Sequence, residues 1–307
     1  MRIVVSLGGN ALLRRGEHPD AAVQRTNVVR VANAVAALAH EHDLVVTHGN
    51  DPQLGLLVKQ SVADPSLAAP YPLDLLGAQS QGLIGTLLVR TLRDVLPGRR
   101  VVALLTHTQV RGDDPAFERP TVPVGPAYPR LAAQFLEAKY GWRMTEVEDG
   151  LRRLLPAPGP ERILESDTVR TLIEMGTVVV CAGGGGVPVV SDWATGAVRG
   201  VEAFVDKDLA AARLAEDLKA DFLLLLTDVP NLYTGYGTPE REPVLDMTPT
   251  ELRAARLPED TMGPKAEAAA RFVENTGGLA AIGALDAAYE IVHGRSGTLV
   301  RPDLPVA

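Results

Sequence analysis

The sequence has one cysteine in 307 residues, Cys181, so it cannot form an intrachain disulfide, which fits a reducing compartment. Cysteines and histidines do not cluster, which argues against a structural zinc site. Basic residues are not in excess, because 30 Lys and Arg face 38 Asp and Glu, for a formal net charge of -8. That balance argues against nucleic acid as the main partner. Internal repeats, heptads and low-complexity segments are also missing.

Long apolar runs are missing as well. Runs such as Phe222 to Leu226 fall far below the roughly 20 residues that a membrane helix needs. The apolar stretch Ile3 to Leu7 is broken by Gly8-Gly9, too early for a signal peptide. We therefore expect a cytoplasmic chain with no membrane partner. A content of 46% hydrophobic and 22% charged residues is typical of a globular protein, and the length allows one large domain or two ordinary ones.

Four consecutive glycines lie near the middle of the chain. They follow a run of β-branched residues in the segment VVVCAGGGGVPVV, Val178 to Val190. Because glycine has no Cβ, the backbone N–H groups of such a turn can closely approach a phosphate. The alternative is a tightly packed or mobile turn after a buried strand. The run favours a phosphate loop and leaves a structural turn open.

Two further predicted strands end in polar turns that contain glycine. Ile3 to Leu7 leads into Gly8-Gly9-Asn10, and Leu44 to Thr47 leads into His48-Gly49-Asn50. Open α/β sheets bind ligands at the carboxyl ends of their strands. Gly49 and Asn50 suit a tight turn facing a ligand, whereas a lone histidine such as His48 is more often structural than catalytic.

Lysines and carboxylates mark the second half of the chain. Asp206-Lys207-Asp208 precedes a helix near Leu209 to Leu218 and is either a charged helix start or a positioned cation, with equal support for both. The predicted strand Phe222 to Leu226 ends at Thr227-Asp228-Val229. Met262-Gly263-Pro264-Lys265 opens a helix, and a proline in the first turn followed by a lysine suits an anion at that end.

Residues 112 to 160 have a different texture, with prolines at 115, 120, 123, 126, 129, 156, 158 and 160 that break any long helix. Aromatic residues such as Tyr128 and Trp142 give this segment something to bury. We predict an inserted subdomain with a short helix near Leu131 to Lys139. Elsewhere the apolar spacing predicts helices near 11–13, 28–38, 53–63, 73–92, 166–175 and 261–274, and strands over 101–106, 279–285 and 298–300.

Seven motifs, in order along the whole chain, resemble the amino acid kinase family and, within it, the carbamate kinases. They are Ser6-Leu7-Gly8-Gly9-Asn10-Ala11, His48-Gly49-Asn50-x-Pro52-Gln53, Ser80-Gln81-Gly82-x-Ile84-Gly85, Asp114-Pro115-Ala116-Phe117, Gly183 to Pro188, Gly200-Val201-Glu202-Ala203 through Asp206-Lys207-Asp208, and Met262-Gly263-Pro264-Lys265.

The resemblance implies an α/β fold, a three-layer αβα sandwich with a mainly parallel open sheet and a protruding subdomain. It implies one domain over 1–307: an acceptor lobe over about 1–200, which includes the subdomain at about 112–160, and a nucleotide lobe over about 201–307. It also implies a homodimer and a place in arginine metabolism. The reaction that the resemblance implies is the family's, ATP plus carbamate giving ADP plus carbamoyl phosphate, with Mg2+, usually run to make ATP.

Phosphoryl transfer needs in-line placement and compensation of charge on the transferring group. The resemblance implies this task for Lys207 and Lys265, while Asp206 and Asp208 aim the lysines or help to place Mg2+ indirectly. No protein ligand for a metal is assigned. The remaining expected contacts are Gly8, Gly9, Asn10, Gly183, Gly184 and Gly185 for phosphate, Gly49, Asn50 and Asp51 for the acceptor, and Thr227, Asp228, Val229, Tyr236 and Met262 for the nucleotide.

The sequence departs from the carbamate kinase pattern on the acceptor side. Val122 stands where a lysine of the subdomain is usual, and Asp51 replaces a glycine. Asp260-Thr261 replaces a Gly-Ser pair, and the segment 148–153 replaces a Gly-Arg-Gly-Trp-Arg-Arg type segment. Losing a cation and gaining carboxylates disfavours a small anion such as carbamate. Arg111 or Arg119 could replace the missing lysine.

Three functions therefore stay open. The motifs favour a carbamate kinase. The second possibility is an enzyme of the same family with a different acid acceptor, for example one whose positive group pairs with Asp51. The third is a nucleotide-binding regulatory homologue with little catalysis. Lys207 and Lys265 argue against the third possibility, whereas Val122 and Asp51 keep it open.

Overall fold

The computed structural model describes residues 1–14, 16–192, 194–238, 240–255, 257–258 and 261–303. Its strands are β1 (Arg2–Leu7), β2 (Asp43–His48), β3 (Val101–Ala103), β4 (His107–Val110), β5 (Val122–Tyr128), β6 (Met144–Val147), β7 (Gly150–Leu155), β8 (Pro160–Ile163), β9 (Val178–Val180), β10 (Val187–Ser191), β11 (Val198–Gly200), β12 (Phe222–Thr227), β13 (Leu232–Thr234), β14 (Glu242–Val244), β15 (Asp246–Met247), β16 (Leu279–Ala284) and β17 (Thr298–Val300). Its α-helices are α1 (Gly9–Leu12), α2 (Ala21–Glu41), α3 (Asp51–Ala63), α4 (Leu73–Val95), α5 (Arg130–Tyr140), α6 (Ser166–Glu174), α7 (Lys207–Asp217), α8 (Pro249–Ala254), α9 (Met262–Thr276) and α10 (Ala288–Val292).

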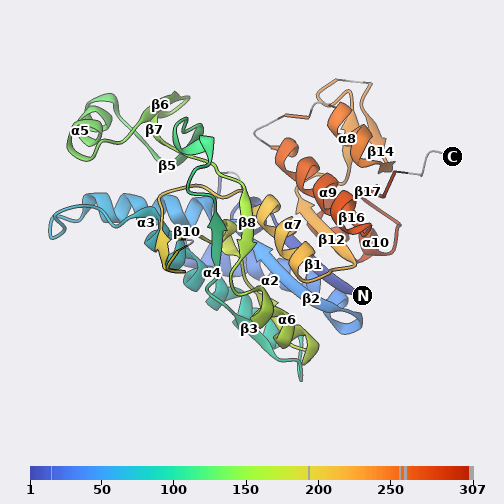
Figure 1. The fold of residues 1–307 in the computed structure, drawn as a ribbon. Coiled ribbons are helices and arrows are strands. Elements are labelled where there is room, and N and C mark those ends of the chain that lie inside the picture. The colour runs from blue at the N-terminus through green and yellow to red at the C-terminus, as the bar shows by residue number, and fades with distance from the viewer. Residues whose placement is uncertain (15, 193, 239, 256, 259–260, 304–307) are drawn as a thin grey trace.

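An eight-stranded sheet forms the centre of the molecule (Figure 1). Its strand order is β15-β17-β16-β12-β1-β2-β9-β3. Neighbouring strands are parallel except where β16 pairs with β17. Because β1 lies between β2 and β12, the sheet joins strands from the two halves of the sequence. The mainly parallel sheet predicted from the sequence is confirmed.

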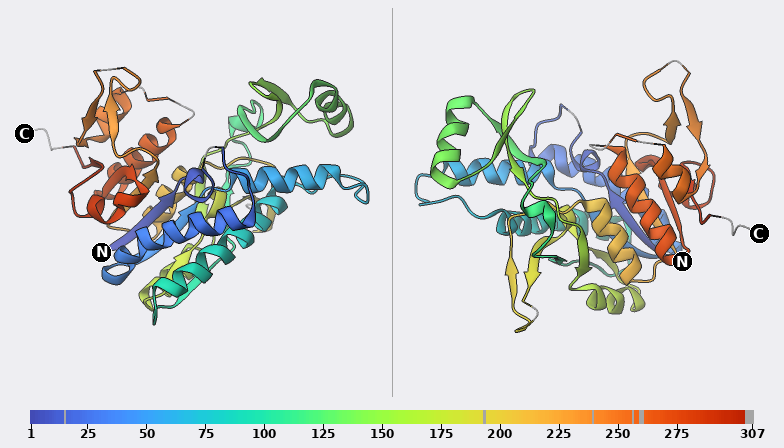
Figure 2. Two further views of the ribbon diagram at one scale, coloured as in Figure 1. Left: turned by 180° about the vertical axis from the view of Figure 1, so that it is seen from behind. Right: turned by 45° about the horizontal axis from the view of Figure 1, so that its top comes forward.

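Two helical layers cover the sheet, which makes three layers in all. Side chains alternate along each central strand: in β1, Val4 belongs to one apolar core, and Ile3, Val5 and Leu7 belong to the other. The first core is completed by α6, α7 and α9, and the second by α2, α4 and α10. Figure 2 shows α2 and α4 crossing the back of the sheet. Strands buried on both faces explain the unbroken apolar runs in the sequence.

Smaller sheets are attached to this body. Strands β11-β10-β4-β8 form a four-stranded sheet, and β13-β14 form a hairpin. The sheet β5-β7-β6, together with α5, stands away from the body in Figures 1 and 2, where the proline-rich insertion was predicted. Its base contacts the body through a small apolar core that contains Val124 and Leu155 of the subdomain and Leu54 and Val58 of α3.

Most predicted elements are present, and the exceptions are instructive. The predicted strand 101–106 ends at Ala103, because Thr106 makes hydrogen bonds outside the sheet. Its N–H donates to Gln81 Oε1 (3.1 Å) and its Oγ1 accepts from Ala182 N (2.8 Å). The helix predicted near 11–13 is only the short α1. None of the helices in the described part of the chain is long and apolar enough to cross a membrane.

Candidate active site

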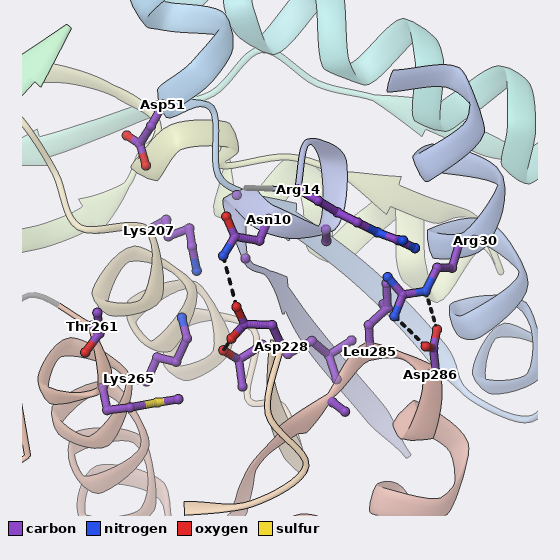
Figure 3. A pocket seen from close by; sticks show the side chains of 17 residues that line it. Asn10, Arg14, Arg30, Asp51, Lys207, Asp228, Thr261, Lys265, Leu285 and Asp286 are labelled. Carbon is purple, nitrogen blue, oxygen red and sulfur yellow. Dashed lines mark hydrogen bonds and ion pairs between the residues drawn. The ribbon is translucent and has the colours of Figure 1, made fainter. Parts of the chain in front are cut away.

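Two adjoining cavities open at the carboxyl edge of β1, β2 and β12. The larger, of about 830 Å3, is lined by residues that follow β1, β12 and β16 and by the start of α9. The smaller, of about 180 Å3, is lined by the turn after β2 and by residues 204–208. Four residues line both: Asp51, Lys207, Thr261 and Lys265 (Figure 3). The two lysines therefore lie where the cavities meet.

Asp208 holds both lysines in place. Lys207 Nζ donates to its Oδ1 at 2.6 Å, and Lys265 Nζ donates to its Oδ2 at 2.7 Å. Ser6 Oγ donates to Asp208 Oδ1 at 2.6 Å and accepts from Lys207 Nζ at 3.3 Å. Asp208 and Lys265 are buried, at 3% and 8% exposure. Because Lys265 comes from α9 and Lys207 from α7, the carboxylate joins two helices at one point.

The charged groups of this cluster shift one another's pKa values. Burial alone would raise the pKa of Asp208, but Lys207 and Lys265 hold it well below its ordinary value. For Lys265, burial favours loss of the proton, but Asp208 outweighs it and raises the pKa. Burial lowers the pKa of Lys207, with Asp208 opposing the shift. Asp208 binds two lysines at once, so their Nζ groups are held together where an anionic ligand can accept hydrogen bonds from them.

Asp206 fixes the start of α7 and with it Lys207. Its Oδ1 accepts from the backbone N–H groups of Asp208 and Leu209, each at 2.9 Å, as the N-cap of the helix. Burial, and next the charge of Asp208, raise the pKa of Asp206. Asp206 and Lys207 are thus a helix cap and a positioned cation together, so the two sequence interpretations do not exclude each other.

The turn after β1 meets the turn after β12 in the larger cavity. Gly8, Gly9 and Asn10 line it, and Asn10 Nδ2 donates to Asp228 Oδ2 at 3.1 Å (Figure 3). Gly8 N donates to Leu226 O at 3.2 Å. The parallel register explains the meeting, because Leu7 pairs with both His48 and Leu226.

The turn after β2 forms the wall of the smaller cavity. Gly49 lies so close to Gly9 that a Cβ there would be 3.0 Å from Gly9 N. Asn50 is buried, and its Nδ2 donates to Ser80 Oγ at 2.7 Å. Asp51 begins α3, and its side chain opens into the cavities. Asp51 is exposed as a residue, but loss of solvent around its carboxyl group in the cavities raises the pKa of that group, and Lys207 opposes the shift.

His48 is a structural histidine. Burial lowers its pKa to about 4, and its Nδ1 lies 2.9 Å from the carbonyl oxygen of Gly49. A Cβ on Gly183 would come within 2.4 Å of its ring. The imidazole is therefore neutral at pH 7 and packed against the glycine run, outside both cavity linings.

The glycine run is tightly packed. Gly184 lines the smaller cavity, whereas Gly183 and Gly185 are buried and do not line either cavity. Gly184 has φ +62, and a Cβ on it would be 2.2 Å from Asn50 Nδ2; one on Gly185 would be 2.2 Å from Val205 O. Glycine is needed here for close approach of neighbouring segments, which matches the structural alternative; a phosphate contact remains a prediction.

The expected nucleotide residues separate into two groups. Thr227, Asp228 and Met262 line the larger cavity. Val229 and Tyr236 do not belong to its lining, and Tyr236 is 67% exposed in the turn between β13 and β14. Tyr236 lies 6.3 Å from Tyr233, centroid to centroid.

Sequence reasoning missed several residues of the site. Ser6 and Ser80 lie inside quoted motifs, yet their bonds to Asp208 and Asn50 became visible only in the structure. Arg14 lines the larger cavity, as does Arg30, whose Nε donates to Asp286 Oδ1 at 2.6 Å (Figure 3). Asp286 follows the carboxyl end of β16, a position that could have been noticed from the strand prediction.

Comparison with known proteins places this arrangement in a family. A model described as "Amino acid kinase family" matches residues 1–282. The chain belongs to the amino acid kinase family. Family members similar to it include a carbamate kinase of Rhizobium meliloti, 46% identical over 98% of this chain and 93% of that protein. A carbamate kinase of Escherichia coli K12 is 43% identical over 97% of this chain and 98% of that protein.

A solved structure of the same family agrees. Carbamate kinase from Giardia lamblia bound to AMP-PNP superposes with a TM-score of 0.92 at 33% identity, covering 98% of each chain. The predicted three-layer α/β fold is confirmed by this likeness and by the sheet itself. As a member of this family, the chain is a phosphotransferase.

The departures from the family pattern gather in a neighbouring cavity of about 600 Å3 between α3 and β5. Val122 and Asp51 both line it, and so do the cationic side chains of Lys59 and Arg152. The suggested substitutes, Arg111 and Arg119, are not in this lining, and Arg111 pairs with Asp113 at 3.0 Å. Of the pair 260–261, Thr261 lines the main cavities and Asp260 lies outside the described residues.

Proposed function

We propose that the protein transfers a phosphoryl group between ATP and carbamate. The observation that carries this proposal is the placement of Lys207 and Lys265, both bound to Asp208, at the junction of a nucleotide-sized cavity and a much smaller one. The identity to carbamate kinases over nearly the whole chain supports the same choice of acceptor.

In the direction that makes ATP, a terminal β-phosphate oxygen of ADP attacks the phosphorus of carbamoyl phosphate. The bond from phosphorus to the carbamate oxygen breaks, and carbamate leaves. Negative charge on the transferring group lies between the two cavities, so the ammonium groups of Lys207 and Lys265 stabilise it there. Asp208 keeps both cations in position before substrate binds, and Asp206 fixes the helix that carries Lys207.

Mg2+ fits this site as part of the nucleotide substrate. Magnesium is usually held by one or two carboxylates together with substrate phosphates. Asp228 lines the larger cavity, and its side-chain partners, Asn10 and Thr227, are neutral. Asp208 is occupied by two lysines, so Asp206 and Asp208 would act on the metal only indirectly, as expected from the sequence.

The remaining assignments belong to the same proposal. The lobe at about 1–200 binds the acceptor through Gly49, Asn50 and Asp51, and the lobe at about 201–307 binds the nucleotide through Thr227, Asp228 and Met262, which line the larger cavity. Of the glycines expected at phosphate, Gly8, Gly9 and Gly184 line the cavities and contact it together with Asn10, whereas Gly183 and Gly185 hold the turn in place. The enzyme works as a homodimer in the cytoplasm, in arginine metabolism.

On the acceptor side, Arg152 and Lys59 compensate for the lysine that Val122 replaces. Arg152 Nε is buried without a hydrogen-bond partner among the described residues, and its Nη2 reaches Asp149 only at 3.5 Å. Its cavity shares Asp51 and Phe204 with the smaller cavity. Arg152→Met should raise the KM for carbamoyl phosphate about tenfold while the KM for ADP stays unchanged, and Arg111→Met is the matched control. An unchanged KM in Arg152→Met would remove Arg152 from this role.

The proposed function is tested by following ATP formation from ADP and carbamoyl phosphate in a coupled assay, together with a panel of carboxylic acids and carbamate in the forward direction. Turnover with carbamoyl phosphate and carbamate alone is the expected result. Turnover with another acid would establish the second candidate, an enzyme with a different acceptor. Tight ATP binding without turnover of any acceptor would establish the regulatory homologue.

A further inference from the structure

Glu202 joins the protruding subdomain to the body of the molecule. Arg153, within β7, donates from Nη1 to Glu202 Oε1 at 3.0 Å and from Nη2 to Oε2 at 2.7 Å. The backbone N–H of Leu73, at the start of α4, also donates to Oε1 at 3.1 Å. The Arg153 side chain is only 13% exposed. One carboxylate therefore holds the subdomain and a body helix together.

Arg153 is itself fixed within the subdomain. Its guanidinium lies 4.4 Å from the ring centroid of Trp142, which comes just before β6. A bidentate, stacked guanidinium is a rigid contact, in contrast to a flexible surface ion pair. A second link lies close by, because Phe204 N donates to Pro156 O at 2.8 Å, joining the residue after β7 to the segment after Glu202.

The segment that receives both links leads directly into the active site. Phe204, Val205 and Asp206 line the smaller cavity, and Lys207 follows them. The segment has little room to shift independently, because Val205 O packs against Gly185, where a Cβ would come within 2.2 Å. A displacement at Glu202 is therefore passed along a short, packed stretch of backbone to the N-cap of α7 and to Lys207.

We propose that Arg153 and Glu202 are positioning residues. They set the geometry of the smaller cavity, which residues 204–208 line, by coupling the protruding subdomain to the segment 203–207. They act through each other and through the backbone, since neither lines the larger or the smaller cavity between which Lys207 and Lys265 lie. This proposal rests on the proposed function in one respect: the kinetic test uses carbamoyl phosphate and ADP as substrates.

The test is a double-mutant cycle with Arg153→Met, Glu202→Gln and the double variant. Glu202→Gln keeps an oxygen for Leu73 N and removes the ion pair. Each single substitution should raise the KM for carbamoyl phosphate and lower kcat. In each variant these two effects should reduce kcat/KM for carbamoyl phosphate about 10- to 100-fold, while the KM for ADP changes less than about twofold. The double variant should be no worse than the poorer single variant. Additive losses, or equal effects on both KM values, would overturn the proposal.

A matched control separates coupling from the loss of any ion pair in the subdomain. Arg130→Met removes the pair with Glu146, which lies within the subdomain and does not reach the body. It should leave both KM values unchanged; a loss of kcat/KM equal to that of Arg153→Met would contradict the proposal.

Arg153→Lys keeps the positive charge but cannot form the bidentate pair, so its kcat/KM for carbamoyl phosphate should lie between those of wild type and Arg153→Met. Calorimetry on each variant checks that the fold persists.

Hydrogen exchange gives a readout that does not depend on the reaction. In Arg153→Met, the backbone amides of 142–156 and 203–206 should exchange faster together, while those of β1 and β2 keep their protection. Exchange unchanged in 203–206 would overturn the coupling even if activity fell. Failure of the wild-type protein to use carbamoyl phosphate would refute the proposed function alone, because this exchange measurement would still decide the link.

Discussion

At the scale of single residues, Asp208 decides what the two lysines can do. A lone buried ammonium tends to lose its proton, and a shared carboxylate opposes that loss. Against the effect of burial, Asp208 raises the pKa of Lys265, and it limits the lowering of the Lys207 pKa that burial causes. Asp208 meets both Lys207 and Lys265, and Ser6 adds a neutral donor. The two Nζ groups are therefore held in place in advance, and the proposed phosphoryl transfer would need no rearrangement of them.

Removing either cation should therefore slow catalysis strongly. Lys207→Ala or Lys265→Ala should lower kcat by about 100-fold or more, because the proposed function makes each lysine a preorganised donor to charge that develops in the transition state. Initial rates of ATP formation measure this loss. Lys139→Ala, an exposed lysine of the subdomain, serves as the control. Near-normal turnover of Lys207→Ala would refute the assignment.

His48 should make stability depend on pH in a defined window. Its pKa is about 4 in the folded protein against an ordinary value of 6.5, so only the unfolded chain binds a proton between these values. The contribution is complete above pH 6.5 and is lost as pH falls towards 4, a total of roughly 3 kcal/mol at 1.36 kcal/mol per pKa unit. The stability that the ionised Asp208 contributes is lost only as pH falls below 3.8, the ordinary pKa of its carboxyl group, which is outside this window.

Urea unfolding at several pH values between 7 and 4 measures this effect. The fall in unfolding free energy across the window should be smaller in His48→Gln than in wild type by about that amount. The comparison uses the slope with pH, so a uniform loss of stability from altered packing against Gly183 does not affect it. Equal slopes in the two proteins would show that His48 is not the group that titrates.

At the scale of secondary-structure elements, the glycine run matters chiefly for how closely it lets other segments approach. Gly184→Ala would place a Cβ 2.2 Å from Asn50 Nδ2, at φ +62. Gly141 has a similar φ of +68 and open space around it, so Gly141→Ala is a matched control for backbone strain alone. Gly184→Ala should cost about 1–3 kcal/mol more than Gly141→Ala, because it overpacks a buried site.

Urea denaturation of both variants measures that difference, and kinetics give a second readout. Since Asn50 lines the smaller cavity, its displacement in Gly184→Ala should raise the KM for carbamoyl phosphate. Equal destabilisation by the two substitutions would mean that the turn relaxes and that close packing is not why glycine is present.

The elements were largely predictable from sequence because the central strands are buried on both faces and read as continuous apolar runs. Prediction failed where hydrogen bonds from distant residues override local pattern. The chain from Val101 onward is apolar enough for a longer strand, but Gln81 and Ala182 bind Thr106 and turn it away. Gln81 comes from α4, so no local signal reveals this.

The site was predictable in part, for a related reason. Lys207 and Lys265 stand in motifs with clear chemical roles, and Asp208 was expected to aim them. That one carboxylate binds both lysines was not visible from the sequence, because Asp208 and Lys265 are 57 residues apart. Arg152 was overlooked in favour of Arg111 and Arg119, which lie nearer to Val122 along the chain. Pairing of β5 with β7 instead brings the 150–155 strand beside Val122. Strand pairing decides which cation lines the cavity between α3 and β5, and the sequence does not reveal that pairing directly.

At the scale of the whole molecule, the two predicted lobes share one sheet and its cores. β1 pairs with β12, and each main core contains residues from both halves, such as Val4 with Leu223 and Val5 with Leu224. Neither half could keep its core if the other unfolded. The larger cavity is likewise built from both, with Gly9 on one side and Met262 on the other.

The shared sheet predicts that the body unfolds in a single cooperative transition and that nucleotide stabilises all of it. With ADP at 100 times its Kd, the unfolding free energy should rise by about 2.7 kcal/mol. Calorimetry and far-UV circular dichroism, each with and without ADP, should report one transition that moves as a whole. Two transitions, of which ADP shifts only one, would instead show that the acceptor and nucleotide lobes are independent domains, because a ligand can stabilise only the unit whose folding forms its site.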